Sequence, residues 1–242
     1  MIQILVKEFN SFLDSLIAYI VIGVFLTVVG LMMWVFPETS VLEYGYADMS
    51  TLFSFAPFVF MFLIPAITMR MFAEEKKSGT LEFLFTRPLS DWQILLGKFF
   101  SGWLLVIVAI LPTIVYYFTL SEISSPVGNV DTSGVIGSYI GLVLLGGVFT
   151  SIGILASSIT SNQIVAFIFA IFLCFIMYSG FDSLAELSTG NAQIYMEQLG
   201  IIYHYNAMSR GVIDSRNLVY FGSVICLMLT ITKTGLGSRK WQ

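Results

Sequence analysis

Charged residues are scarce in this sequence. They make up 11% of the 242 positions, while hydrophobic residues reach 57%, and a soluble protein carries about 25% charged residues. A soluble protein of this length has too little interior to hide so much apolar surface. Cysteine is scarce too, and Cys174 and Cys226 both fall inside apolar runs, so a disulfide framework is not expected. The composition predicts a membrane protein.

Several kinds of chemistry are also missing. The long apolar runs hold no Asp, Glu, Lys, Arg or His in their interiors, whereas ion-coupled transporters retain such residues at a cost of about 2.5–3.5 kcal/mol each. No phosphate-binding loop of the GxxxxGK[ST] type occurs, because Trp92 stands where the first glycine would precede Gly97 and Lys98. No basic patch with interleaved aromatics suggests nucleic acid. Any energy source must therefore lie outside this chain.

The apolar runs predict an all-α membrane protein with six transmembrane helices in a single domain, 1–242. A spanning helix needs about 20 apolar residues, and the charge-free stretch 132–181 is too long for one crossing. Thr160 to Gln163 divides it, with Ser161 or Asn162 as the N-cap of the second helix. The expected spans are about 17–36, 49–69, 99–120, 135–159, 163–181 and 217–232.

Three segments outside or within these spans have further features. Residues 1–16 place apolar side chains at helical spacing opposite polar ones, which is typical of an amphipathic helix lying in the membrane interface. Pro57 and Pro65 are expected to bend the second span. Gly137 and Gly141 stand at GxxxG spacing in the fourth span, which favours close helix packing over a substrate role.

The basic residues orient the six spans. Nine lie on the side of the termini and two on the opposite side: Lys7, Arg70, Lys76, Lys77, Arg87, Lys98, Lys233, Arg239 and Lys240 against Arg210 and Arg216. Because Lys and Arg mark the cytoplasmic side, both termini and the segment 70–98 are expected in the cytoplasm.

The segment 70–98 is the most charged part of the chain and has a readable internal structure. Lys76 and Lys77 end a helix, and Gly79 supplies a left-handed cap residue. A short helix is predicted from Thr80 to Thr86, ended by Pro88. Ser90 and Gln93 form a capping box for the next helix, with Leu89 and Ile94 as its hydrophobic staple. The pattern predicts helix, transverse helix and helix.

The run GTLEFLFTRPLSDWQILLGKFF resembles the first cytoplasmic loop of type-2 ABC exporter permeases. The segments KEFNSFLDSLIAYIVIGVFL, LASSITSNQIVAF and HYNAMSRGVIDSRNLVYF also resemble that family, so the likeness covers nearly the whole chain. A narrower resemblance is to the gliding-motility-associated permease subunit, through WVFP, FLIPAITMR, FAEEKKSGTLEFL, RPLSDWQILLGKF, SPVGN and NQIVAFI.

The resemblance implies a multi-pass subunit of the bacterial cytoplasmic (inner) membrane that moves a substrate with ATP hydrolysed by a separate ABC ATPase. This chain would itself bind no cofactor and would pair with a second permease or an auxiliary membrane subunit, as a homo- or heterodimer. The loop between spans 2 and 3 would be the coupling helix that docks on the ATPase. The implied coupling residues are Glu74, Glu75, Gly79, Thr80, Glu82 and Pro88.

Two alternatives remain open at this point. A membrane scaffold without transport activity would explain the spans but not the detailed pattern of the loop. An intramembrane protease of the prenyl-protein type is suggested by the paired Glu74 and Glu75. Those proteases need an arginine where this chain has Gly79, together with histidines in other spans, whereas the lone His204 reads as a surface or interface residue.

The segment 182–216 is expected outside the cytoplasm. It holds too many apolar residues for a freely solvated loop. Short helices dipping into the outer leaflet, forming a lid over the exit of the translocation path, are therefore predicted here.

Overall fold

The computed structural model describes residues 1–81, 89–211 and 214–237, and these are helical with no strand. The described residues include six helices long and apolar enough to cross a membrane. This confirms the predicted all-α fold with six transmembrane helices. The six are Leu16–Trp34 (α2), Ser50–Lys77 (α4 and α5), Asp91–Ile123 (α7, η1 and α8), Thr132–Ile159 (α9), Gln163–Leu187 (α10, η2 and α11) and Ser215–Gly237 (α14).

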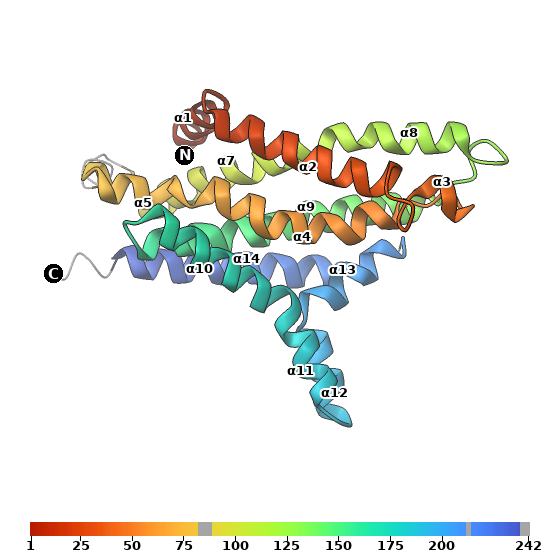
Figure 1. The fold of residues 1–242 in the computed structure, drawn as a ribbon. Helices are drawn as coiled ribbons and strands as arrows, with labels where there is room; N and C mark the ends of the chain where they lie inside the picture. Colours follow the sequence, from red (N-terminus) through yellow and green to blue (C-terminus); the bar gives the residue numbers. More distant parts are fainter. Residues whose placement is uncertain (82–88, 212–213, 238–242) are drawn as a thin grey trace.

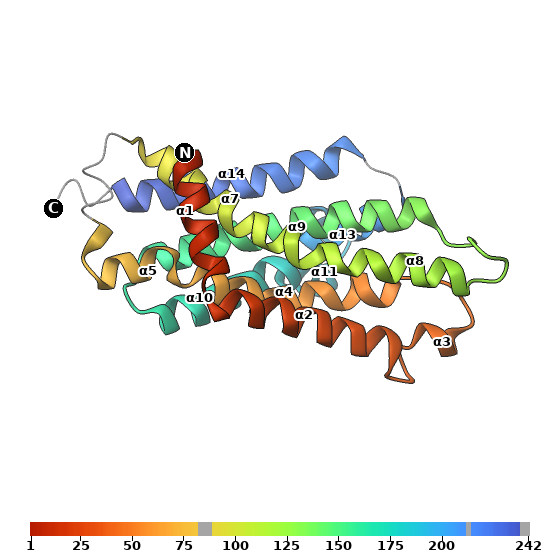
Figure 2. The same cartoon turned by 90° about the horizontal axis from the view of Figure 1, so that it is seen from above.

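The long helices lie side by side, and the bundle has two distinct ends (Figure 1). The helix α1 (Ile2–Leu13) and the last turn of α14 lie at one end, together with α5 (Arg70–Lys77); we call it the termini end. The short helix α3 (Val41–Tyr44) and the loop between α8 (Ile114–Ile123) and α9 lie at the other, which we call the far end. In Figure 2, α1 crosses the bundle instead of running along it. It packs on α7 (Asp91–Ile110).

The helix α9 forms the centre of the bundle. It contacts α4 (Ser50–Thr68), α5, α7, α10, α13 and α14. Its glycines permit these close approaches: a Cβ on Gly137 would lie 2.2 Å from the carbonyl oxygen of Met208, and one on Gly153 would lie 2.0 Å from Oγ1 of Thr68. Gly141 lies against the ring of Tyr205. The prediction that small residues in this span serve helix packing agrees with this geometry.

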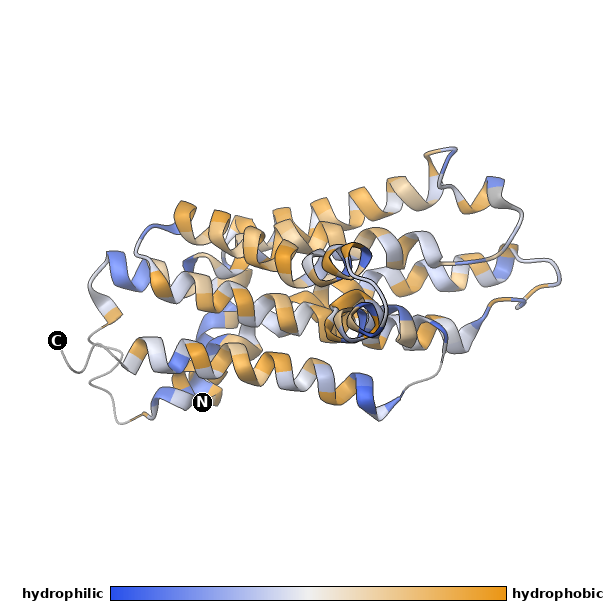
Figure 3. Ribbon diagram, turned by 90° about the horizontal axis from the view of Figure 1, so that it is seen from below, coloured by the Kyte–Doolittle hydropathy of each residue, from blue (hydrophilic) through white to orange (hydrophobic). Residues whose placement is uncertain are grey.

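The outer helices α2, α10 (Gln163–Phe175) and α14 present apolar side chains outward. Only 28%, 22% and 17% of their most apolar windows are buried, against 83% for α9. Hydrophobic residues dominate the middle of the long helices, and hydrophilic ones gather at helix ends and connections (Figure 3). An apolar exterior with polar ends is what a bilayer requires of a bundle that crosses it.

The segment that follows α10 leaves the bundle. A π-helical turn, Ile176–Gly180 (η2), joins α10 to α11 (Phe181–Leu187), and α12 (Asn191–Leu199) returns beside α11. Figure 1 shows this pair projecting away from the bundle, and α12 has no buried residue. The predicted short helices are present, but they form no lid over this chain's own bundle. Instead α13 (Ile201–Ser209) packs against α9.

The lone histidine lies on α13 and has an interface role. One ring nitrogen of His204 lies 2.7 Å from Oδ1 of Asn217 on α14, and the other lies 2.9 Å from the carbonyl oxygen of Gln198 on α12. Its ring stacks on Tyr220 with centroids 3.9 Å apart. The side chain thus ties three helices together, as expected for an interface histidine.

Pro57 interrupts the hydrogen-bond ladder of α4. Without an N–H at position 57, the carbonyl of Phe53 loses its partner within the helix. The hydroxyl of Tyr205 on α13 donates to that carbonyl over 2.8 Å. A neighbouring helix therefore satisfies the carbonyl that the proline frees, as expected for a bent membrane helix.

Candidate functional site

The base of the predicted coupling loop is a break between α4 and α5 at Met69. Oγ of Ser157, from α9, donates to the carbonyl of Met69 over 2.8 Å and accepts from the amides of Phe72 and Ala73 over 3.0 Å each. A side chain inserted into the helical ladder in this way is an ordinary cause of a kink. Ser157 therefore fixes where α5 begins and how it leaves the bundle.

The C-terminal end of α5 carries the predicted cap. Lys76 and Lys77 lie in its last turn, and Lys76 Nζ donates to the carbonyl of Ser158 at the end of α9. Gly79 follows with φ of +70°, and a Cβ built there would meet nothing within 4 Å. The left-handed conformation predicted for Gly79 is thus confirmed. Its conformation, and not crowding, requires glycine at this corner.

The predicted coupling residues differ in their surroundings. Glu74, Gly79 and Thr80 are exposed, and the Thr80 hydroxyl lies 2.8 Å from that of Ser78. Glu75 is half-buried and engaged within the chain. Glu82 and Pro88 lie outside the described residues, as does most of the predicted transverse helix.

A buried lysine organises the interior behind this corner. Lys98 on α7 is only 1% exposed. Its Nζ donates to Oε1 of Glu75 over 2.9 Å, to Oε1 of Glu8 over 3.1 Å and to the carbonyl of Met71 over 2.7 Å. The ammonium also lies 5.1 Å from the ring centroid of Phe72. Three helices, α1, α5 and α7, therefore meet at one cation; we call Glu8, Glu75 and Lys98 the ionic cluster.

A second cation supports the same region. Nη1 of Arg70 donates to Oγ of Ser15 over 3.1 Å, and its guanidinium lies 4.7 Å from the ring centroid of Phe12 on α1. Arg70 begins α5, so this contact links the start of α5 to the connection between α1 and α2. Exposed Lys7 lies 3.6 Å from Glu8 and balances the remaining negative charge of the ionic cluster.

The sequence analysis did not find the ionic cluster, although a signal was present. Ile94, Lys98, Ser101 and Leu105 are all buried on α7. Their spacing of three and four residues places Lys98 on the apolar face. On α1, Ile4 and Phe12 are buried, with Glu8 midway between them. Glu8 and Lys98 each lie on an apolar helix face, where a lone charge needs a counter-charge. The sequence could therefore have predicted that they pair.

The start of α7 follows the sequence pattern closely. The Ser90 hydroxyl accepts from the amide of Gln93, and the Gln93 side chain accepts from the amide of Ser90. Leu89 and Ile94 lie in the same apolar cluster. The predicted capping box is confirmed, and it sets the direction in which α7 enters the bundle.

The arrangement at the termini end is suited to transmitting a displacement. Among the described residues no group of His, Cys, Asp and Glu could hold a metal ion. An exposed corner at Gly79 is joined through α5 to α9 by Ser157, and to α7 and α1 by the ionic cluster. A force applied to the corner therefore reaches three other helices through short, polar contacts.

Comparison with protein families gives one match. Residues 37–190, more than half of the chain, match the family described as ABC-2 family transporter protein. That range includes the predicted coupling segment and four of the six spanning helices in full, from α4 to α11. No curated protein matches the chain. Together with the six-helix fold, the family match shows that this chain belongs to the ABC-2 family of transporter membrane proteins.

Proposed function

We propose that this chain is the permease subunit of an ABC exporter driven by a separate ATPase, which docks on the corner around Gly79. The observation that carries the proposal is the contrast within α5. Its tip is exposed and left-handed at Gly79, while its base is held by Ser157 and the ionic cluster. A protruding element with a rigid attachment suits the transfer of movement from a partner into the membrane bundle.

The proposal divides the predicted residues into two groups. Exposed Glu74 and Thr80 would contact the ATPase, where Glu74 can accept charge-assisted hydrogen bonds from Arg or Lys. Glu75 would act through Lys98, because its Oε1 already accepts from that ammonium. Glu82 and Pro88 keep the coupling role that the family resemblance gives them.

The membrane orientation is part of the same proposal. The proposed orientation has the termini end in the cytoplasm of a bacterium and the chain in its inner membrane, and the distribution of basic residues, nine against two, supports it. Single cysteines at Ser78 and Ser125, without Cys174 and Cys226, test this. An impermeant reagent added to spheroplasts is expected to label position 125 alone, and labelling at 78 would overturn the orientation.

The family match supports an ABC ATPase partner in general, and the proposal extends it to a second membrane subunit. Two permease chains would form a unit of twelve spans, and the sparsely buried faces of α2 and α10 are available for lipid or for a second subunit. The finer assignment to gliding motility rests on the segments WVFP, FLIPAITMR and RPLSDWQILLGKF. Deleting the chain's gene in its native host is expected to abolish gliding, and normal gliding would remove that assignment.

The docking test uses two glycines with the same backbone conformation. Gly79 at the termini end and Gly45 at the far end have φ of +70° and +71°, and a Cβ at either would meet nothing within 4 Å. Valine at each position therefore imposes a similar local strain, about 1–2 kcal/mol. Gly79→Val is expected to abolish co-purification of the ATPase in mild detergent, whereas Gly45→Val retains it.

Charge-reversal variants provide a second test of ATPase docking. Glu74→Lys and Glu82→Lys are expected to weaken ATPase association while membrane levels stay near normal, and Glu43→Lys at the far end serves as the matched control. If both variants and Gly79→Val retain the ATPase and transport, the loop is only a connector. If no ATPase co-purifies with the unaltered chain under several conditions, that result supports the alternative that the chain is a membrane scaffold without transport activity.

A further inference from the structure

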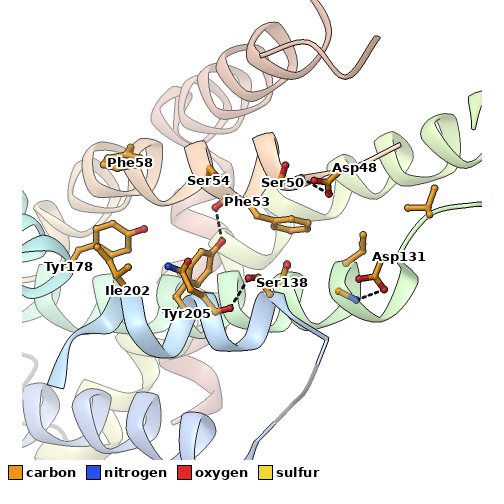
Figure 4. Close-up of a pocket in the computed structure, with 15 residues that line it drawn as sticks. Asp48, Ser50, Phe53, Ser54, Phe58, Asp131, Ser138, Tyr178, Ile202 and Tyr205 are labelled. Carbon is orange, nitrogen blue, oxygen red and sulfur yellow. Dashed lines mark hydrogen bonds between the residues drawn. The ribbon is translucent and has the colours of Figure 1, made fainter. Parts of the chain in front are cut away.

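A cavity of about 370 Å³ opens at the far end of the bundle, between α4, α9 and α13 (Figure 4). This volume falls within the range of about 300–1,000 Å³ typical of small-molecule sites. The side walls are fixed in place, because Tyr205 donates its hydroxyl to the carbonyl of Phe53 across the cavity. Nothing in the coupling mechanism uses this cavity.

The lining changes character from one end of the cavity to the other. Asp48 and Asp131 lie at one end, and Phe58 and Tyr178 at the other (Figure 4). The rings of Phe58 and Tyr178 meet edge to face, with centroids 5.8 Å apart. Along α4, Phe58 lies about 12 Å from Ser50, at a rise of about 1.5 Å per residue. The lining residues include no Lys, Arg or His.

Both carboxylates accept local hydrogen bonds that hold them in place. Oδ1 of Asp131 accepts from the amide of Gly134 over 3.1 Å and from the hydroxyl of Ser133 over 2.8 Å. These hydrogen bonds lower the pKa of the Asp131 carboxyl below its ordinary value. Oδ1 of Asp48 accepts from the amide of Ser50 over 3.0 Å. A carboxylate can accept more hydrogen bonds than its cap uses, so both can also face a ligand.

Ser138, in the wall contributed by α9, points independently to a ligand. Its residue is 3% exposed, and its hydroxyl makes no hydrogen bond to any part of the chain that the structure describes. This oxygen is not one of the fully enclosed atoms without a partner in the described residues, which are Nη2 of Arg70 and Oε2 of Glu75, so it is open to the cavity. The Ser138 hydroxyl therefore lacks a partner that an occupant of the cavity would supply.

We propose that this cavity binds an amphipathic cation, a ligand with an ammonium group attached to an apolar body. The ammonium would lie between Asp48 and Asp131 and the apolar body against Phe58 and Tyr178, with Ser138 bonded to a polar atom between them. An anion would meet two carboxylates with no basic residue in the lining. A wholly apolar ligand would face the two carboxylates without balancing their charge and would leave Ser138 unbonded. The inference does not depend on the proposed transport function, because binding is measured on the isolated chain.

The test uses two fluorescent probes that differ only in charge. Dansylcadaverine carries a primary ammonium on an alkyl chain attached to an aromatic body, and dansyl pentylamide lacks the ammonium. The purified chain in phosphatidylcholine nanodiscs is expected to bind dansylcadaverine saturably and at least tenfold more tightly than dansyl pentylamide. Equal affinity for the two probes, or no saturable binding of either, would overturn the proposal.

Variants locate the binding to the cavity. Asp48→Asn and Asp131→Asn keep the helix-capping oxygen, since Asn caps as well as Asp, and each is expected to weaken dansylcadaverine about tenfold without affecting dansyl pentylamide. Phe58→Ala should weaken both probes alike, and Ser138→Ala should weaken dansylcadaverine by a few-fold. Glu122→Gln removes an exposed carboxylate at the same end of the bundle and should change neither. Asn variants that bind like the unaltered chain would place the probe elsewhere.

A final comparison distinguishes a free amine from a lipid headgroup. Nanodiscs containing phosphatidylethanolamine present a primary ammonium with N–H donors at the membrane surface, whereas the trimethylammonium of phosphatidylcholine has none. If they lower the apparent affinity for dansylcadaverine, and Asp48→Asn removes that competition, the headgroup is the occupant. If the affinity is unchanged, the site selects a free amphipathic amine. Either result requires the same ammonium-binding geometry.

Discussion

At the termini end, Glu8 and Glu75 both accept from the ammonium of Lys98, within 3.1 Å. At the far end, Asp48 and Asp131 accept instead from backbone amides at helix starts, and no basic residue joins them in the cavity lining. The first pair of carboxylates binds an ammonium of the same chain and so joins three helices. In the second pair, Asp131 caps α9 and Asp48 accepts from the first amide of α4, and both carboxylates line an open volume. Acidic residues of one chain thus serve attachment at one end and are available for binding at the other.

The same contrast holds for close packing. At the termini end, a Cβ on Gly97 of α7 would lie 2.9 Å from Cβ and Cγ2 of Ile4 on α1 and 3.3 Å from the carbonyl oxygen of Met1. At the far end, Gly137 of α9 meets the backbone carbonyl of Met208 on α13. The overlap at Gly137 is the closer of the two, and the carbonyl that it meets lies within a helix and cannot move without displacing that helix. We therefore expect α1 to yield more easily than α13, and the following predictions test the comparison, beginning with the largest effect.

Removing the central cation should destabilise the termini end most. Lys98→Met leaves Glu8 and Glu75 close together, with exposed Lys7 beside Glu8 as the remaining counter-charge. Breaking a buried ion pair costs about 3–5 kcal/mol, and the partial exposure of both carboxylates lowers our expectation to about 2–4 kcal/mol. Thermal or denaturant unfolding in detergent measures the loss. Exposed Lys77→Met is the control, with an expected change within about 0.5 kcal/mol.

A double variant sharpens this result. Glu8→Gln in the Lys98→Met background removes one of the two carboxylate charges and should recover part of the lost stability. The two changes would then be non-additive, as expected for groups in one network. Strict additivity, or a Lys98→Met protein as stable as the unaltered chain, would mean that the ionic cluster contributes nothing to holding α1, α5 and α7 together.

Alanine at the two packed glycines compares the two ends directly. A Cβ at Gly137 would lie 2.2 Å from the carbonyl oxygen of Met208, and one at Gly97 would lie 2.9 Å from Cβ of Ile4. Gly137→Ala is expected to cost about 2–3 kcal/mol, near the upper part of the range for overpacking, and Gly97→Ala about 1 kcal/mol. Unfolding of both variants in the same detergent gives the difference.

Gly23→Ala is the matched control, because a Cβ there meets nothing within 4 Å. Alanine should raise stability at that position by up to about 1 kcal/mol through helix propensity. Hydrogen exchange in the Gly97→Ala variant should increase within α1 alone. An equal cost at Gly97 and Gly137 would show that α1 is held as rigidly as α13.

The smallest effect concerns the proline-freed carbonyl in the cavity wall. Tyr205→Phe removes the donor to the Phe53 carbonyl and should cost about 1–2 kcal/mol. Tyr178→Phe is the control, since its hydroxyl makes no hydrogen bond to the described residues. In a Pro57→Ala background, the restored amide at position 57 can donate to Phe53 within α4, and Tyr205→Phe should then cost less. The same cost in both backgrounds would show that Tyr205 does not serve this carbonyl.

The sequence by itself determined the local features of this protein. Six apolar runs of spanning length gave six helices, and Asn162 caps α10 with its side chain accepting from the amide of Ile164. The capping box of Ser90 and Gln93 and the left-handed Gly79 were also predictable. Each of these depends on residues within a turn or two of one another, where hydrogen-bond geometry and backbone sterics decide the outcome.

Only the tertiary structure decided which distant groups meet. Lys98 bonds Glu8 across 90 positions of the chain, and Ser157 enters the ladder of α5 from 84 or 85 positions away. The cavity likewise exists only because α4, α9 and α13 converge without filling the space between Asp131 and Phe58. Periodicity places a residue on a helix face but does not say which helix covers that face. That choice depends on the summed packing of all six spans, which no local pattern encodes.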